Sequence, residues 1–256
     1  MMVKKLEGKK GLIVGIANEQ SIAWGCAKAF RSEGAELAIT YLNDKAYPFV
    51  YPLAKQLEAP IVLPLDVRDD TQMDAVFEAV KTQWGKLDFL LHSIAFAPRE
   101  DLHGRVADCS REGFLTAMDI SCYSFIRMAH CAEPLMTNGG CLLTTSYYGG
   151  ERVVEHYSMM GPVKSALEGA VRYLAAEMGR QHIRVNALSP GPILTRAAGG
   201  LADFDELIRE AQQKSPSHEK PTLDDVGAMA AFLVSDDARH ITGNITFIDC
   251  GTHIMA

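Results

Sequence analysis

Residues 11–25 read GLIVGIANEQSIAWG, a short apolar run that meets a glycine, a polar turn and a second apolar stretch. The apolar run predicts a buried strand, and residues 21–32 predict a helix. Gly15 can turn the chain sharply, while Ser21 can cap the helix and leave its first amides free for a pyrophosphate. Gly25 would let the helix pack closely on the sheet. Because the turn lacks a G-x-G-x-x-G pattern, an ordinary strand-to-helix connection explains it as well.

The same alternation of apolar runs and helical patterns continues along the chain. We expect strands at 11–14, 36–41, 61–65, 87–92, 141–145, 183–188 and 245–248, and helices at 21–32, 71–84, 157–178 and 223–234. Continuous apolar strands separated by helices predict an α/β protein with a doubly wound, Rossmann-type parallel sheet covered by helices on both faces. The length fits a single domain over residues 1–256. The proline- and glycine-rich segment 189–221 predicts a helical substrate-binding lid.

The composition limits the classes of partner. The chain carries 25 Lys and Arg against 32 Asp and Glu and has no basic run, so a nucleic-acid partner is not expected. Its six cysteines are scattered without a C-x-x-C pair, which argues against a zinc site and for a reducing compartment. The polar start is unlike a signal peptide, and no apolar run approaches the ~20 residues that span a bilayer. We therefore expect a cytoplasmic protein without a membrane contact or a metal.

The ends of later strands strengthen the nucleotide hypothesis, because ligands of doubly wound sheets bind beyond the carboxyl ends of the strands. Asp66 and Val67 follow the third expected strand, where a carboxylate can meet an adenine amino group. The segment 93–97 follows the fourth strand with small residues that would let a ribose approach the backbone, and 189–193 follows the sixth. Each could be a plain loop, but together they favour a dinucleotide.

The end of the second expected strand bears on the choice of cofactor. A 2'-phosphate would favour an arginine at this position. Residues 40–44 contain none, and Lys45 lies slightly further on. The sequence therefore favours NADH, with NADPH as the weaker alternative.

Tyr157 and Lys164 are candidates for the chemistry. In a continuous helix their seven-residue spacing would place both side chains on nearly one face, about 10 Å apart along the axis. A tyrosine can donate a proton, and a lysine that binds the nicotinamide ribose can also favour the phenolate. The alternative is a buried Tyr and a surface Lys on an amphipathic helix, and the spacing alone favours that alternative.

Seven motifs change this balance. They are GIANEQSIAWG at 15–25, HSIAFAP at 92–98, REGF at 111–114, DISCYSF at 119–125, SYYGGER at 146–152, YSMMGPVK at 157–164 and RVNALSPGPI at 184–193. With these motifs the chain resembles the short-chain dehydrogenase/reductase superfamily and, within it, the bacterial NADH-dependent enoyl-acyl-carrier-protein reductases. The resemblance covers essentially the whole chain. The motifs are highly specific jointly, although RVNA alone is common across the superfamily.

The resemblance implies a set of site residues. The catalytic residues would be Tyr157, Lys164 and Tyr147. The cofactor-binding residues would be Gly15, Ser21, Ile22, Leu42, Asp66, Val67, Ser93, Ile94, Ala95, Lys164, Ile193 and Thr195. The substrate-binding residues would be Ala97, Tyr147, Tyr157 and Met160. Leu42 stands where relatives often carry a polar residue, which puts its contact with the adenosine ribose in doubt.

The resemblance also implies an activity and partners. It implies NADH-dependent reduction of the 2,3 double bond of trans-2-enoyl thioesters, bound to acyl carrier protein, in the elongation cycle of type II fatty acid biosynthesis. Tyr157 would stabilise the enolate oxygen, and Lys164 would hold the ribose hydroxyls. A homotetramer is implied, with long helices such as the apolar stretch 166–174 between subunits. The basic residues Arg196, Arg209, Lys214 and Lys220 could contact an acidic carrier protein, although a solvated charged face explains them as well.

The spacing of the tyrosine separates this family from its carbonyl-reducing relatives. Those place Tyr four residues before Lys and Ser about seventeen before it, where this chain has Met160 and Tyr147. They also use an Asn on an earlier helix, and residues 101–137 contain none. The ketone-reducing constellation is therefore absent. Two alternatives remain open: a carbonyl or alcohol oxidoreductase of the same superfamily, and a catalytically inactive dinucleotide sensor.

Overall fold

The computed structural model describes residues 4–195 and 204–255, which form one seven-stranded sheet in the order β3-β2-β1-β4-β5-β6-β7. The strands are β1 (Lys10–Val14), β2 (Glu36–Tyr41), β3 (Ile61–Pro64), β4 (Phe89–His92), β5 (Gly140–Thr145), β6 (Ile183–Pro190) and β7 (Ile245–Ile248). Every neighbouring pair is parallel. The predicted doubly wound parallel sheet is confirmed, and each predicted strand is present within two residues of its expected bounds.

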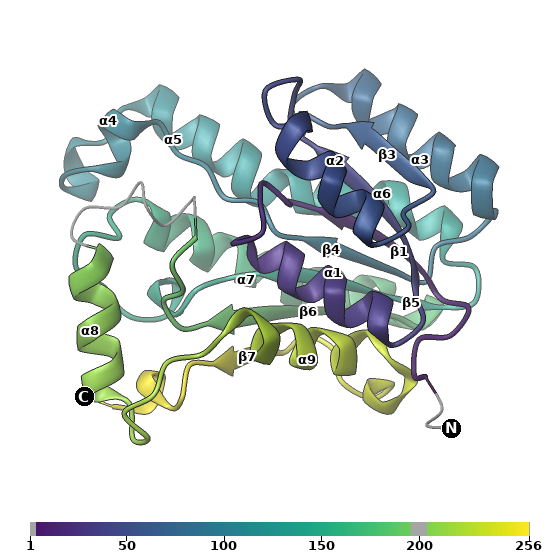
Figure 1. The fold of residues 1–256 in the computed structure, drawn as a ribbon. Helices are drawn as coiled ribbons and strands as arrows, with labels where there is room; N and C mark the ends of the chain where they lie inside the picture. Colours follow the sequence, from purple (N-terminus) through teal and green to yellow (C-terminus); the bar gives the residue numbers. More distant parts are fainter. Residues whose placement is uncertain (1–3, 196–203, 256) are drawn as a thin grey trace.

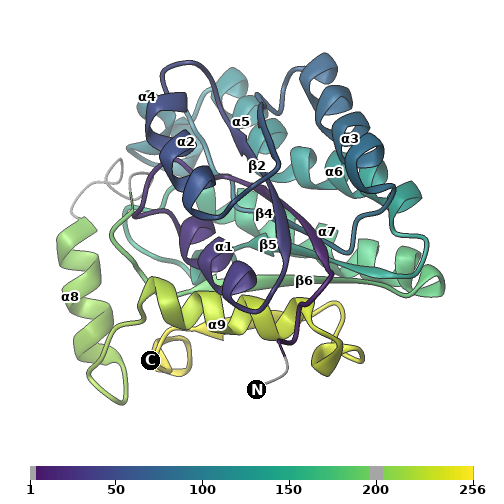
Figure 2. The same cartoon turned by 45° about the vertical axis from the view of Figure 1, so that its right-hand side comes forward.

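Helices cover both faces of the sheet (Figures 1 and 2). They are α1 (Ile22–Ser32), α2 (Tyr47–Gln56), α3 (Asp70–Trp84), α4 (Arg99–Leu102), α5 (Arg111–Met118), α6 (Ser124–Ala132), α7 (Met160–Met178), α8 (Phe204–Lys214) and α9 (Leu223–Val234). Buried side chains of α3, α6 and α7 form one apolar cluster with the sheet, and those of α1, α2 and α9 form a second. Along β1, Leu12 and Val14 point into the first cluster and Ile13 into the second, as strands buried on both faces require.

Several helices were not predicted. Helix α2 begins with a proline in its first turn and contains Pro52, so its sequence reads as a loop. Helices α5 and α6 are joined by the π-helical turn η2 (Asp119–Tyr123), which interrupts the helical periodicity between them. None of the helices that the structure describes is long and apolar enough to cross a membrane.

Tyr157 does not lie on the helix that carries Lys164, and the predicted helix over 157–178 is wrong at its start. Helix α7 begins at Met160. His156 and Ser158 have left-handed φ values of 61° and 46°, which a continuing α-helix does not allow. The hydroxyl of Ser158 donates to the carbonyl oxygen of Gly104 at 2.8 Å. Tyr157 therefore belongs to a turn, and the argument from a shared helix face does not apply to it.

The role expected for Gly25 is also corrected. A Cβ on this residue would lie 2.6 Å from the backbone oxygen of Leu223, at the start of α9. A Cβ on Gly227 of α9 would lie 2.6 Å from the backbone oxygen of Gly25. The glycine therefore permits close packing of α1 on α9 and not of α1 on the sheet.

Candidate active site

The site is organised around the edge of the sheet where the parallel strands end. The strand order changes direction between β1 and β4, which is where doubly wound sheets bind their ligands. Gly15, directly after β1, has a φ of 118°, and a Cβ there would overlap the backbone oxygen of Ser93, directly after β4. The predicted sharp turn is therefore present, and only glycine allows the two loops to approach so closely.

The turn before α1 leaves the helix without a side-chain cap. Ser21 occupies the N-cap position, but its hydroxyl accepts hydrogen bonds from the amides of Ala17 and Asn18 at 3.0 and 3.1 Å and makes no capping bond. The predicted cap is thus wrong: the Ser21 side chain binds no amide of the first turn, although the Ser21 carbonyl accepts from the amide of Trp24 at 2.9 Å. With the tight approach at Gly15, this arrangement fits the pyrophosphate of a dinucleotide.

The two outer strand ends carry the residues expected near the adenosine. Leu42 is exposed beyond β2, and Val67 is buried beyond β3. The Asp66 carboxylate accepts hydrogen bonds from the Arg68 guanidinium, Nε to Oδ1 at 3.0 Å and Nη2 to Oδ2 at 2.6 Å. These bonds hold the pKa of Asp66 below its ordinary value, so the carboxylate is ionised. An adenine amino group would have to share it with Arg68.

The loop after β4, residues 93–97, is held from two sides. Thr145 at the end of β5 donates to the Ser93 hydroxyl at 3.2 Å. Ser121 in η2 accepts from the amide of Phe96 at 2.9 Å and donates to its carbonyl oxygen at 3.1 Å. The sequence contained Ser121 within a family motif but gave it no role. The structure shows that it fixes the backbone beside the predicted cofactor residues.

His92 ends β4, as predicted, and ties three elements together. Its Nδ1 lies 2.9 Å from the Thr144 hydroxyl and its Nε2 lies 2.8 Å from the Ser124 hydroxyl. The Ser124 hydroxyl also donates to the Ile120 carbonyl at 2.7 Å, and the Thr144 hydroxyl to the His92 carbonyl at 3.2 Å. Burial and the nearby Lys164 lower the pKa of His92 to about 3, so the ring is neutral. Among the described residues, no group of three His, Cys, Asp or Glu could hold a metal.

Tyr157 and Tyr147 form a buried pair of phenols. Their ring centroids are 4.8 Å apart with an interplanar angle of 62°, an edge-to-face contact. Burial raises the pKa of both phenols above their ordinary value, and each of the nearby groups Tyr147 and Glu168 raises the pKa of Tyr157 further. Both phenols therefore remain protonated at neutral pH and can donate hydrogen bonds. Burial of Tyr157 thus opposes the phenolate form that Lys164 is expected to favour.

Lys164 is 4% exposed, and its ammonium is oriented by the protein itself. The Nζ atom donates to the carbonyl oxygen of Thr145 at 2.7 Å. Burial lowers the pKa of Lys164 to about 8, against the opposing effects of Glu168 and Cys122. An ammonium has three donors, so the bond to Thr145 leaves two for the hydroxyls of a ribose.

The structure brings the predicted substrate-binding residues into one apolar cluster. Its buried members are Ala117, Tyr157, Met159, Met160 and Val163, and Ala97 and Tyr147 pack against them. Of the predicted cofactor residues, Ile94 packs against the core on one face of the sheet, and Ile22 and Ile193 pack against the core on the other. Ala95 lies in the loop after β4, and Thr195 lies two residues beyond Ile193 in the segment after β6.

Glu168 is a second residue of this region, besides Ser121, that was not predicted from the sequence. Its side chain is 2% exposed and accepts a hydrogen bond from the Ser146 hydroxyl at 2.5 Å. Burial raises the pKa of Glu168 above its ordinary value. Its position four residues after Lys164 could have identified it, because residues i and i+4 share one face of a helix.

Comparison with known proteins identifies the family. The family model described as Enoyl-(Acyl carrier protein) reductase matches residues 15–253. The chain belongs to this family. Among the enoyl reductases similar to it is Enoyl-(acyl-carrier-protein) reductase (NADH) 2 of Rhizobium meliloti, 46% identical over 251 residues, which are 98% of this chain and 94% of the relative. The resemblance inferred from the motifs is confirmed.

Solved structures of enoyl-acyl-carrier-protein reductases share the whole fold. The enzyme from Anaplasma phagocytophilum, solved with NAD, is 49% identical with a TM-score of 0.94, over 98% of this chain and 96% of the other. The enzyme from Bacillus cereus, solved with NADP+ and indole naphthyridinone, is 44% identical with a TM-score of 0.96, over 99% of both chains. The likeness therefore extends over the sheet, the helices and the candidate site.

Proposed function

We propose that the protein reduces the 2,3 double bond of trans-2-enoyl thioesters carried on acyl carrier protein, with NADH, in the elongation cycle of type II fatty acid biosynthesis. The observation that carries this proposal is the position of the Tyr157 phenol, which lies against Tyr147 in a turn before the helix of Lys164. Carbonyl-reducing relatives would need a tyrosine at position 160, where this chain has methionine. Membership of the enoyl reductase family supports the same activity.

The residues divide the work between binding and charge stabilisation. When bound, the nicotinamide supplies a hydride for the β-carbon of the enoyl thioester. Tyr157 donates a hydrogen bond to the thioester oxygen as negative charge develops there. Its raised pKa keeps the proton on the phenol, so the donor is present throughout the physiological pH range. Lys164 holds the ribose hydroxyls with the two donors that Thr145 leaves unused, which fixes the position of the reacting ring.

NADH is the proposed cofactor. The end of β2 and the residues after it, 40–44, contain no arginine to bind a 2'-phosphate. The Rhizobium meliloti relative is named for NADH, whereas the Bacillus cereus structure contains NADP+. Initial rates with the two cofactors at matched concentrations test the assignment, and a lower KM for NADPH would contradict it.

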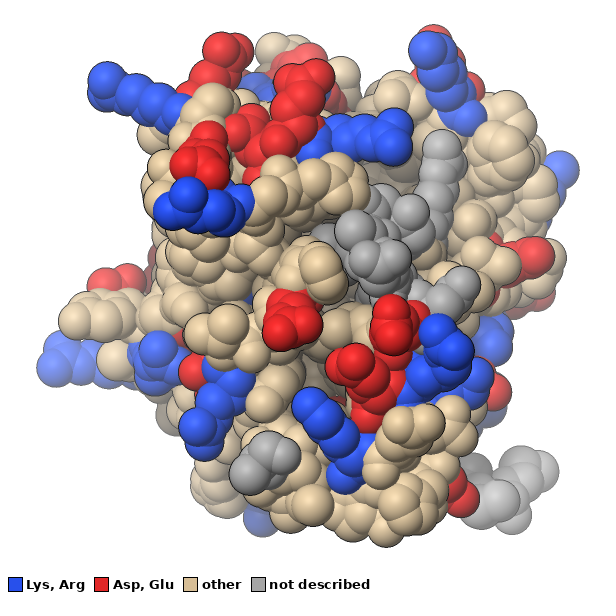
Figure 3. All heavy atoms as spheres, turned by 90° about the vertical axis from the view of Figure 1, so that its left-hand side faces the viewer, with Lys and Arg blue, Asp and Glu red and all other residues tan. Residues whose placement is uncertain are grey.

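We propose that residues 1–256 form a single domain and that segment 189–221, which includes α8, is its substrate-binding lid. We propose that the carrier protein contacts the same segment. Arg209 and Lys214 of α8 are exposed, and Lys220 follows the helix; Arg196 lies outside the described residues. The face that carries α8 shows basic and acidic side chains side by side (Figure 3). A mixed surface supports a contact that combines a few charge pairs with the apolar acyl chain.

We further propose that the protein acts in the cytoplasm as a homotetramer. All six cysteine thiols are free, which suits a reducing compartment. The apolar residues Leu167, Val171 and Leu174 of α7 are buried in the protein's own core and do not support an interface. Support comes instead from the exposed side chains of Tyr173 on α7, Tyr123 in η2 and Ile126 on α6.

A single assay distinguishes the candidate functions. NADH oxidation is followed by absorbance, first with a crotonyl thioester and then with a small ketone. We expect turnover with the thioester and none with the ketone. Turnover of the ketone alone would favour a carbonyl reductase. If NADH binds but neither substrate is reduced, an inactive dinucleotide sensor would replace the proposed enzyme.

A further inference from the structure

Two buried side chains of α7, one helical turn apart, hold two consecutive residues at the end of β5. Lys164 Nζ donates to the Thr145 carbonyl at 2.7 Å, and Glu168 Oε1 accepts from the Ser146 hydroxyl at 2.5 Å. Tyr147 is the next residue of the chain. Helix α7 therefore fixes the backbone immediately before a phenol of the candidate active site.

Glu168 also contacts the chain on the other side of Tyr147. A Cβ on Gly150 would lie 2.9 Å from Glu168 Oε1, so the backbone passes directly over the carboxylate. The amide of Gly150 donates to the Tyr147 carbonyl at 2.8 Å, which closes the turn 147–150. The Ser165 hydroxyl donates to the Gly150 carbonyl from the same helix. The loop that carries Tyr147 is thus held against α7 at both of its ends.

The charge of Glu168 acts on Lys164 as well. Burial lowers the pKa of Lys164, and Glu168 opposes that effect by favouring the ammonium form. The other titratable groups around the two residues are Arg172 on α7, Glu151 after the loop, Tyr157, Cys122 in η2 and His92 on β4. A glutamine could accept the bond from Ser146, so the hydrogen bond alone does not require a buried acid, whereas support of the Lys164 charge does.

We propose that Glu168 is a positioning residue: it holds the Tyr147 loop through Ser146 and keeps Lys164 charged for the cofactor, without touching the substrate. The inference that Glu168 keeps Lys164 charged concerns NADH binding alone and is independent of the proposed reduction. The inference that Glu168 positions the Tyr147 loop rests on the proposed function, because it is tested by measuring kcat with an enoyl thioester.

The first test separates charge from shape. Glu168→Gln keeps the size and the hydrogen-bond acceptor and removes the charge. The Kd for NADH is measured by fluorescence titration between pH 6.5 and 9.5. In the unchanged protein, we expect Kd to rise as pH passes about 8 and Lys164 loses its proton. In Glu168→Gln this rise should move to lower pH, because the lysine has lost the carboxylate that favours its charged form.

The second test isolates the loop. Ser146→Ala removes the hydrogen bond and leaves both charges in place. We expect kcat with the crotonyl thioester to fall by about tenfold, because a small displacement of an active-site group is costly, while the pH profile of NADH binding stays in place. Glu78→Gln on α3 makes the same chemical change as Glu168→Gln at an exposed helix position, and should alter neither readout.

The outcomes decide the inference in each case. A pH profile of NADH binding in Glu168→Gln that matches the unchanged protein would overturn the charge role, and an unchanged kcat in Ser146→Ala would overturn the loop role. If Glu168→Gln does not fold, Glu168→Asp is used; it keeps the charge, so a shifted pH profile in a folded Glu168→Asp would contradict the proposal. If the unchanged protein binds NADH but reduces no thioester, the proposed function fails while the binding test still applies.

Discussion

At the scale of single residues, the chemistry depends on which groups keep their protons. Tyr157 lies in a buried pair with Tyr147, and burial raises the pKa of both phenols. A phenol in this state is a hydrogen-bond donor and a poor base. This favours stabilisation of an oxyanion over abstraction of a proton, in agreement with the reduction of a conjugated thioester.

The first prediction concerns that donor. Tyr157→Phe should lower kcat for the crotonyl thioester by about 100- to 1,000-fold, the usual effect of removing one oxyanion donor. The Kd for NADH should change by less than about twofold, since the proposed contact of Lys164 with the ribose is unchanged. Stopped-flow rates and fluorescence titration measure the two quantities. The exposed Tyr173→Phe serves as the control, and an unchanged kcat in Tyr157→Phe would exclude the assigned role.

A second prediction follows from His92. Its pKa is about 3 in the folded protein and about 6.5 in the unfolded chain, so between these values only the unfolded state binds the proton. Acidification below pH 6.5 therefore lowers the free energy of unfolding, by at most about 1.4 kcal/mol per pH unit from this group. His92→Gln, which cannot titrate, should show a shallower loss in urea denaturation between pH 6.5 and 5. The exposed His240→Gln should keep the original slope.

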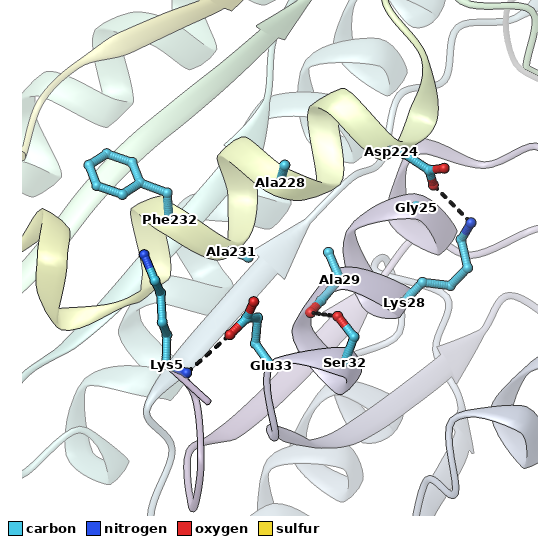
Figure 4. Close-up of a pocket in the computed structure, with 10 residues that line it drawn as sticks. All are labelled: Lys5, Gly25, Lys28, Ala29, Ser32, Glu33, Asp224, Ala228, Ala231 and Phe232. Atoms are coloured by element: carbon cyan, nitrogen blue, oxygen red, sulfur yellow. Dashed lines mark hydrogen bonds and ion pairs between the residues drawn. The ribbon is translucent and has the colours of Figure 1, made fainter. Parts of the chain in front are cut away.

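At the scale of elements, α1 and α9 cross so closely that the side chain at position 25 cannot be larger than that of glycine without a shift of the backbone. Gly25 lies under the start of α9 (Figure 4), where Lys28 pairs with Asp224 at 3.0 Å beside the close backbone contact. The third prediction is that Gly25→Ala lowers the free energy of unfolding by about 1–3 kcal/mol, because the neighbouring atoms are backbone and cannot rotate away. Ser32→Ala, on the same helix, should change it by less than about 0.5 kcal/mol. Urea denaturation measures the free energy of unfolding of both variants, and equal values for Gly25→Ala and Ser32→Ala would contradict the prediction.

The sequence predicted the strands better than the helices, for a physical reason. Strands buried on both faces are continuous apolar runs such as 11–14, and a parallel order brings their carboxyl ends to one edge. This placed Gly15 and Ser93 correctly. The position of Tyr157 could not be predicted in this way, since the left-handed backbone at His156 and Ser158 leaves no composition signal. The spacing of Glu168 from Lys164 indicates a shared helix face, but the burial of Glu168 depends on tertiary packing.

At the scale of the whole molecule, the candidate site lies at the carboxyl ends of the strands. The carboxyl edge collects residues from segments about seventy positions apart, such as Ser93 and Lys164, which both bind Thr145 at the end of β5. Helices α4 and α8 lie toward the same edge (Figure 1). The elements η2, α6 and α7 expose the apolar side chains Tyr123, Ile126 and Tyr173, respectively. Exposed apolar groups on adjacent helices support the proposal of an interface between copies of the chain.

The last prediction tests that interface. Tyr173 is 75% exposed on α7, and in a tetramer its ring would be buried between subunits. We expect Tyr173→Glu to lower the mass measured by light scattering from that of four chains, because an unpaired carboxylate in an apolar interface is strongly unfavourable. Val153→Glu places the same charge at a residue that is 99% exposed, in the loop before Tyr157, and should keep the original mass. A tetramer that survives Tyr173→Glu would place the interface elsewhere, and a monomeric unchanged protein would show that these side chains face solvent.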